Sequence, residues 1–332
     1  MRIFSGIRAS GDKTLGNYSG GFRQYFATQE QAAAEGGAAF FCIVDLHSIT
    51  TPFEPAVLHE STLSVAAWLF ATGLDADRST VFVQSHVTAH PQAAWLLSSV
   101  TSFGELRRMT QFKDRAAEQD FVSAGLFNYP VLMAGDILLY QTDLVPIGDD
   151  QRQHLELTRD IAERFNQRFG ETFTVPQGVY PEVGSRIKNL QEPERLMSTT
   201  RGAPQGVVRM IDAAEEIRRK FKTAVTDSGT DVRHAPEDKP GISNLLEIMS
   251  VATGDPIPEL EARYDGQGYG RFKEDVAEAV VALLTPIQER YDKLRADENE
   301  LRALLARGAE KAREASAPTL EQMYERMGFV KP

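Results

Sequence analysis

The first half of the chain alternates short apolar runs with longer stretches whose apolar residues recur at helical spacing. The runs are brief, rich in β-branched or aromatic residues and bounded by Gly, Ser, Asp or Pro, which is typical of buried strands. They lie at residues 2–5, 38–45, 79–85 and 143–147. Strands separated by helices predict an α/β fold with a Rossmann-like, doubly wound parallel sheet. Such sheets bind ligands outside the carboxyl ends of their strands.

Beyond about residue 190 the strand-like runs stop and helical patterns follow one another. A segment rich in Gly, Pro and Thr at 199–206 disfavours regular structure and marks the change. We therefore expect a nucleotide- and substrate-binding domain over residues 1–190, a linker over 191–206 and a mainly helical domain over 207–332, whose last helix packs back on the first domain. The predicted helices of this half span residues 212–224, 240–253, 257–263, 270–295, 298–315 and 318–327.

Composition narrows the classes of function. Of the 332 residues, 42% are hydrophobic and 25% charged, as in a soluble globular protein. We see no apolar run of about 18 residues and no secretion signal, so we expect a cytoplasmic protein without membrane contact. The lone cysteine, Cys42, excludes an internal disulfide and a zinc site of several thiolates. The net charge of -11 argues against non-specific nucleic-acid binding, and the basic run 217–222 is either a local patch or a solvated helix face.

A segment rich in glycine and serine, residues 5–21, follows the first predicted strand and leads into a helix. Backbone N–H groups at the start of a helix can hold phosphate groups. Thr14 is placed to cap this helix, with Gly16 and Asn17 in its first turn. The spacing matches neither the dinucleotide-binding G-x-G-x-x-G nor a P-loop. From the residues alone, a phosphate-binding turn and a tight turn without a ligand remain alternatives.

Four residues in the stretch 129–140 share one face of a predicted helix. Tyr129, Met133, Asp136 and Tyr140 stand at i, i+4, i+7 and i+11. They form either an ordinary core stripe or a pocket in which a carboxylate accepts the N–H of an indole ring. Such a pocket would reject a ring without that donor, because the carboxylate would stay unpaired. His47, at the end of a predicted strand, is likewise either a core residue or a ligand-binding one.

Residues 3–18, IFSGIRASGDKTLGNY, resemble the first class I signature of bacterial tryptophanyl-tRNA synthetases. The resemblance continues in order through nearly the whole chain, in residues 41–50, 110–114, 123–166, 224–229, 239–246 and 286–291. It implies a class I, AMP-forming tryptophan–tRNA ligase that uses ATP and Mg²⁺ to activate L-tryptophan and transfers it to tRNA(Trp). Methionine at position 133 favours tryptophan, because the related tyrosyl enzymes typically carry glutamine there.

The resemblance also implies which residues form the site. Asp136 would accept the indole N–H, Met133 would flank the ring, and Gln151 or Tyr129 would hold the amino group. The implied tryptophan-binding residues are Phe4, Ser5, Gly6, His47, Tyr129, Met133, Asp136, Val145, Ile147 and Gln151. The implied ATP-binding residues are Arg8, Ala9, Ser10, Gly16, Asn17, Gly148, Asp149, Asp150, Ile187, Leu196, Met197, Ser198, Thr199 and Thr200. The implied catalytic residues are Arg8, Thr14, Asn17, Lys113, Ser198 and Arg201. No metal held by the protein itself is expected, because Mg²⁺ would travel with the triphosphate.

The second class I signature, KMSKS, is divergent. Residues 196–202 read LMSTTRG, so both lysines are absent. The second lysine normally neutralises the departing pyrophosphate, and removing one such group costs about 100- to 1,000-fold in rate. The chain is therefore either an inactive paralogue that senses tryptophan or binds a protein, an enzyme that adenylylates another acceptor, or a ligase with relocated cations. We favour relocation, with Arg8 and Arg201 sharing the duty and Lys113 and Arg195 as further candidates, because the whole tryptophan-binding set is present.

The resemblance further implies a homodimer and a helical domain that reads the anticodon. Residues 91–100, which include Trp95, are either the dimer surface or part of the core.

Overall fold

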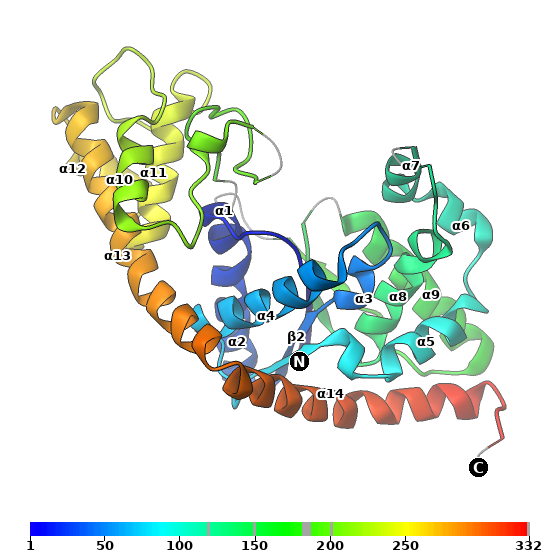
Figure 1. Cartoon of the computed structure of the whole chain (residues 1–332). Coiled ribbons are helices and arrows are strands. Elements are labelled where there is room, and N and C mark those ends of the chain that lie inside the picture. Colours follow the sequence, from blue (N-terminus) through cyan, green and yellow to red (C-terminus); the bar gives the residue numbers. More distant parts are fainter. Residues whose placement is uncertain (118–119, 149–150, 181–186, 200–201, 331–332) are drawn as a thin grey trace. The chain divides into compact units, whose positions relative to one another are not determined.

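The computed structural model describes residues 1–117, 120–148, 151–180, 187–199 and 202–330 (Figure 1). The chain forms two compact units, and each draws on separate parts of the sequence. Unit 1 comprises Met1–Ser10, Tyr25–Pro181 and Asp297–Pro332, and unit 2 comprises Gly11–Gln24 and Glu182–Ala296. The units therefore interleave along the chain, whereas the sequence suggested contiguous domains divided near residues 190 and 207.

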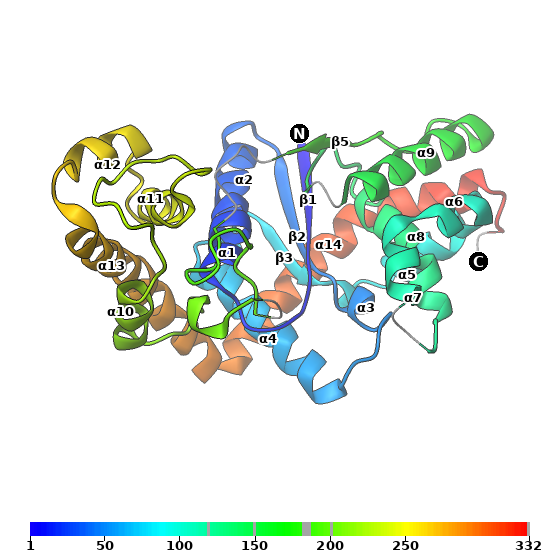
Figure 2. The ribbon, with the colours of Figure 1, turned by 90° about the horizontal axis from the view of Figure 1, so that it is seen from above.

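Unit 1 is built on a parallel sheet with the strand order β3-β2-β1-β4-β5. The chain moves outward from β1 to β3 on one side and then from β4 to β5 on the other, so the sheet is doubly wound, as predicted. Figure 2 shows β1, β2 and β3 side by side. The strands span Arg2–Ile7 (β1), Ala38–Ile43 (β2), Thr80–Val83 (β3), Leu144–Pro146 (β4) and Gln177–Val179 (β5).

The apolar runs became strands because their side chains are buried on both faces of the sheet. Phe4 lies opposite Phe40 in the register of β1 and β2, and Phe41 lies opposite Val81 in that of β2 and β3. Each of these four residues is at most 4% exposed. Continuous burial of this kind is typical of parallel sheets covered by helices. The short strand β5 was missed because its sequence, Gln-Gly-Val, carries no apolar run.

Helices cover the sheet of unit 1. They span Arg23–Ala34 (α2), Asp45–Ser48 (α3), Pro55–Ala71 (α4), Ala89–Ser98 (α5), Phe103–Arg108 (α6), Thr110–Ala117 (α7), Ala124–Leu138 (α8), Arg152–Phe169 (α9) and Glu298–Arg326 (α14), and a 3₁₀ turn, η2, covers Gln84–His86. The C-terminal helix α14 packs against β3, α5 and α4. The expected break between residues 315 and 318 is wrong, because α14 runs through Pro318 without interruption.

Unit 2 is mainly helical in its described part. It contains Leu15–Asn17 (α1), a π-helical turn Tyr18–Phe22 (η1), a 3₁₀ turn Pro204–Gly206 (η4), Ala214–Lys222 (α10), Pro240–Thr253 (α11), Ile257–Arg263 (α12) and Gly268–Ala296 (α13). The long helix α13 packs against both α10 and α11. Thr14 caps α1 as predicted, because its hydroxyl accepts from the backbone N–H of Asn17 at 3.2 Å.

The basic run 217–222 lies on α10, and most of its cations form ion pairs with carboxylates of unit 2. Arg218 pairs with Glu278 at 2.6 Å and Arg219 with Glu216 at 2.7 Å. Lys220 is buried and pairs with Asp212 at 2.5 Å. Three of its cations are therefore neutralised within the unit. No helix in the described ranges is long and apolar enough to span a membrane.

Candidate active site

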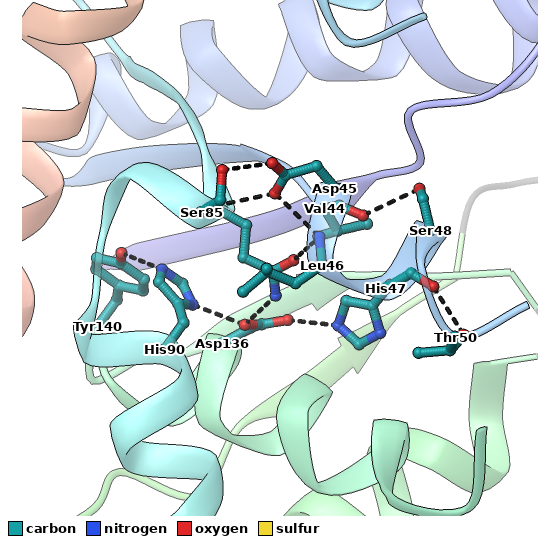
Figure 3. A network of polar contacts seen from close by, with 11 residues as sticks. Val44, Asp45, Leu46, His47, Ser48, Thr50, Ser85, His90, Asp136 and Tyr140 are labelled. Carbon is teal, nitrogen blue, oxygen red and sulfur yellow. Dashed lines mark hydrogen bonds and ion pairs between the residues drawn. The ribbon is translucent and has the colours of Figure 1, made fainter. Parts of the chain in front are cut away.

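Polar side chains gather where β2 and β3 end. Asp45 and His47 lie on α3, directly after β2, and Gln84 and Ser85 lie on η2, directly after β3. The backbone N–H of Leu46 donates to Oε1 of Gln84 at 3.1 Å, and that of Ser85 donates to Oδ1 of Asp45 at 3.0 Å. Figure 3 shows the contact between Ser85 and Asp45. These contacts fix the two ends relative to each other at the edge where parallel sheets bind ligands.

Helix α8 delivers Asp136 into this cluster. Oδ2 of Asp136 lies 2.8 Å from Nε2 of His47, and Oδ1 lies 2.6 Å from Nδ1 of His90. Nε2 of Gln84 donates to the same Oδ1 at 2.7 Å. Asp136 is only 1% exposed, so a carboxylate stands almost fully out of contact with water. A buried charge of this kind is tolerated only when it is fully hydrogen bonded.

The surroundings keep Asp136 ionised. Burial alone would raise its pKa, but the hydrogen bonds from His47 and His90 outweigh burial and hold the pKa of Asp136 below its usual value. Since an ionised carboxylate only accepts hydrogen bonds, both histidine nitrogens must carry the proton that faces it. A carboxylate offers about four lone-pair positions. The three contacts use both positions of Oδ1 and one of Oδ2, which leaves one position on Oδ2 for a donor from a ligand.

Several of the predicted apolar residues lie in the core of unit 1. Phe4 of β1, Val145 of β4 and Ile147 are buried in one hydrophobic cluster, and the partly buried Met133 packs against it. Ser5 is 3% exposed, and its hydroxyl has no hydrogen-bond partner in the part of the chain that the structure describes. These residues were all predicted to bind tryptophan, and all of them belong to unit 1. Gly6, on the same strand, is exposed.

Tyr129 lies one helical turn before Met133, with its ring edge-on to that of His47 at 6.1 Å. Its hydroxyl lies 2.6 Å from Nε2 of His154 and 3.2 Å from Oε1 of Gln111. Because a phenol has one proton, it can donate to only one of these atoms at a time. Burial raises the pKa of Tyr129 to about 12, against the opposing positive charge of Arg115. The phenol therefore stays protonated at neutral pH and offers its oxygen lone pairs to a cation.

The remaining polar residues of unit 1 are more open. Arg8 and Ser10 are exposed and Ala9 is buried. Desolvation and the nearby positive charge of Arg115 lower the pKa of Arg8, so an anion between the two guanidinium groups would be stabilised. Lys113 is exposed on α7. The backbone N–H of Gln151, at the start of α9, donates to the carbonyl of the exposed Gly148 at 3.0 Å.

Unit 2 brings parts of both signature segments together. A Cβ on Gly16 would lie 3.6 Å from Cβ of Met197, so the first turn of α1 contacts the divergent signature directly. The backbone N–H of Met197 donates to the carbonyl of Ile187 at 3.0 Å. Leu196 and Thr199 are exposed, and Ser198 is partly buried. Four predicted site residues lie outside the described residues: Asp149, Asp150, Thr200 and Arg201.

Three residues of this cluster were not predicted from the sequence: Gln84, His90 and His154. The first two belong to the segment QSHVTAH, residues 84–90, which begins inside the predicted strand 79–85 and directly follows β3. Polar residues at that position were a usable signal, because the carboxyl ends of parallel strands carry the ligand sites. His154 is buried in the first turn of α9 and gave no comparable signal.

Curated relatives match this chain over its full length. The family model described as tRNA synthetases class I (W and Y) matches residues 1–285. Tryptophan–tRNA ligase 2 of Streptomyces avermitilis is 51% identical over 332 residues, covering 99% of this chain and 97% of that protein. Tryptophan–tRNA ligase of Listeria monocytogenes is 50% identical over 327 residues, covering 98% and 97%.

Solved structures agree with this assignment. Tryptophanyl-tRNA synthetase of Mycoplasma pneumoniae has a TM-score of 0.86 at 35% identity, covering 99% of this chain and 98% of that one. The Campylobacter jejuni enzyme, crystallised with ADP and tryptophan, has a TM-score of 0.84 at 32% identity, covering 99% and 100%. With the doubly wound sheet and the polar cluster at its carboxyl edge, these matches place the chain in a family: it belongs to the class I tRNA synthetases of the tryptophan (W) and tyrosine (Y) group.

Proposed function

We infer that this chain is a tryptophan–tRNA ligase, which activates L-tryptophan with ATP and transfers it to tRNA(Trp). The observation that carries the choice of amino acid is the buried, ionised Asp136. Its one remaining lone-pair position can accept the single N–H of an indole, and its apolar neighbours suit the rest of the ring. A phenyl ring, which has no donor, would leave this position unpaired, and such a site discriminates strongly.

The two reaction steps need positioning more than a protein nucleophile. The tryptophan carboxylate attacks the α-phosphorus of ATP, pyrophosphate leaves, and a terminal ribose hydroxyl of the tRNA then takes the aminoacyl group. Catalysis therefore rests on orientation and on stabilising phosphate charge. Tyr129 and Gln151 are proposed to hold the amino group of the substrate, and the predicted ATP-binding and catalytic residues to hold the nucleotide.

Magnesium enters this proposal with the nucleotide. Its preferred ligands are oxygens, and the triphosphate supplies them together with water. Unit 2 is proposed to read the anticodon, and two copies of the chain to form a homodimer. We place the reaction in the cytoplasm, where tRNA and ATP are available. The Campylobacter jejuni structure with ADP and tryptophan supports the pair of small substrates.

The test is tryptophan-dependent ATP–pyrophosphate exchange by the purified chain, followed by aminoacylation of tRNA(Trp). We expect both activities in the wild type, and we expect Asp136→Asn to lower kcat/KM for tryptophan by about 100-fold or more, because a charged hydrogen bond to the substrate is lost. Asp275→Asn is the matched control. Asp275 accepts a hydrogen bond from Tyr264 in unit 2, so the same chemical change there should leave exchange unaltered.

Each activity excludes a different rival. A chain that binds tryptophan without exchange would be a sensor, and one that exchanges without charging tRNA would adenylylate another acceptor. Unchanged exchange in Asp136→Asn would contradict the proposed role of the carboxylate.

A further inference from the structure

The side of Asp136 away from His47 leads into a chain of buried polar groups. Oδ1 is held by Gln84 and by His90, and both residues are 0% exposed. Nε2 of His90 continues the chain to the hydroxyl of Tyr140 at 2.9 Å. Figure 3 shows Tyr140, His90, Asp136 and His47 in a row. Asp136, the proposed acceptor of the indole N–H, is thus connected through His90 to Tyr140, and both of these side chains are fully buried.

The protons along this chain can be assigned from the partners. Asp136 only accepts, so Nδ1 of His90 carries a proton toward it. Burial raises the pKa of Tyr140 far above its usual value, so its hydroxyl is protonated. In the tautomer with the proton on Nδ1, Nε2 of His90 accepts from this hydroxyl. A change at Tyr140 therefore reaches Asp136 through the orientation of one imidazole ring.

The end of the chain is fixed by aromatic packing. The fully buried ring of Tyr140 stacks on Phe4 at 5.6 Å with an 18° angle between the planes. It also lies 4.6 Å from the ring of Phe40 and 5.8 Å from that of Phe82. Phe82 packs against His90 as well, at 5.7 Å. A hydroxyl anchored in this way is a rigid support for the imidazole, as outer partners are for the ligands of metal sites.

We propose that His90 and Tyr140 are positioning residues that determine specificity, because they hold the Asp136 carboxylate with its remaining Oδ2 position turned to the indole N–H. Without His90, Oδ1 would be held by Gln84 alone and Oδ2 by His47, so the carboxylate would lose one of its three hydrogen bonds and the orientation that this bond enforces. This positioning role rests on the proposed function. His90 and Tyr140 would make the pocket prefer a ring that carries an N–H over an otherwise similar ring that lacks one.

The test compares tryptophan with β-(benzothiophen-3-yl)alanine, in which sulfur replaces the ring N–H while the shape is kept. The ratio of kcat/KM for the two substrates in ATP–pyrophosphate exchange reports the contact to Asp136 alone. Tyr140→Phe and His90→Ala should lower this ratio by about 10- to 100-fold, the value of one hydrogen bond to a charged group. His90→Asn should retain most of the ratio, because its amide can donate to Asp136 from near the place of Nδ1.

Tyr264→Phe is the matched control, since this buried tyrosine of unit 2 also loses a hydroxyl bound to a carboxylate, that of Asp275. Its ratio should equal that of the wild type. An equal fall of kcat/KM for both substrates in Tyr140→Phe would mean a purely structural role and would overturn the proposal. Should His90→Ala fail to fold, Tyr140→Phe decides, because it removes one oxygen and keeps the ring. A wild type without tryptophan-dependent exchange would instead overturn the proposed function, and the positioning role with it.

Discussion

Arg8 and Arg115 bear on the proposal that other cations replace the missing lysines of the divergent signature. The guanidinium group of Arg115 lies 5.8 Å from the centre of the Tyr129 ring, and desolvation together with the charge of Arg115 lowers the pKa of Arg8. Two like charges held close together are unfavourable until an anion joins them. Phosphate groups of ATP or pyrophosphate are suitable anions, and planar guanidinium groups bind them with two hydrogen bonds. This arrangement supports the proposal that cations outside the KMSKS segment assist the departure of pyrophosphate.

The double variant Arg8→Ala, Arg201→Ala tests the proposal that these two cations share the duty of the missing lysine. We expect tryptophan-dependent pyrophosphate exchange to fall by about 100- to 1,000-fold, because preorganised charge opposite the leaving group is lost. The KM for tryptophan should change little, since Asp136 and its partners are untouched. Arg78→Ala is the control, because Arg78 pairs with Glu30 on the surface of unit 1 at 2.7 Å. Exchange at the wild-type rate in the double variant would show that other groups carry this duty.

In the proposed tryptophan pocket, the sequence predicted the residues of α8 better than those that follow the strand ends. Tyr129, Met133 and Asp136 could be grouped because helical spacing places them on one face of α8. Gln84 and His90 could not be assigned to Asp136, because they come from a different strand end, and spacing along the sequence does not reveal contacts across a sheet. The sequence left a core position and a ligand-binding position as alternatives for Asp136. The two are compatible, because the carboxylate is buried and still has one acceptor position.

At the scale of elements, predictions succeeded where the local pattern was decisive. The runs at β1 to β4 and the helices α11 and α12 were found, because apolar periodicity and flanking Gly or Pro mark them clearly. Because of Pro318, the sequence predicted two helices where the structure has the single helix α14. Proline removes one backbone N–H and usually ends or kinks a helix, yet here the helix is packed against β3 and α5 along its length. Tertiary packing of this kind outweighs the cost of one missing hydrogen bond, and it cannot be seen in the local sequence.

The contact between α14 and β3 depends on Gly308. A Cβ at this position would overlap the carbonyl oxygen of Val81, a backbone atom that cannot move aside easily. We expect Gly308→Ala to lower the free energy of unfolding by about 1–3 kcal/mol, as overpacking of a core does. Chemical denaturation monitored by circular dichroism measures this change.

Gly270→Ala is the matched control for that substitution. Gly270 lies within α13, and a Cβ there would have nothing within 4 Å. The same change should therefore raise stability by up to about 1 kcal/mol, because alanine favours the helix more than glycine does. A Gly308→Ala variant as stable as the wild type would mean that α14 can shift away from β3 at no cost.

At the scale of the whole molecule, large apolar side chains remain exposed on unit 1. Trp95 on α5 is 78% exposed and Phe103 on α6 is 67% exposed, and both helices pack on α8. Of the segment 91–100, Trp95 is exposed while Leu96 and Leu97 are buried, so the segment contributes to the core and also to the surface. Exposed aromatic residues that gather on one face mark interaction surfaces more often than chance placement does. The face is continuous with a further ring, since Phe103 lies 4.9 Å from Phe127 of α8.

The proposed homodimer gives these side chains a place to be buried. Tryptophan at the centre of an interface is commonly a hot spot, so Trp95→Glu should raise the dissociation constant of the dimer by about 30-fold or more, equivalent to about 2 kcal/mol. Sedimentation velocity over a range of concentrations measures it. Val57→Glu is the control, because Val57 is also exposed but lies on α4. A wild type that sediments as a monomer at micromolar concentration, or a Trp95→Glu variant as dimeric as the wild type, would contradict the assignment of this face.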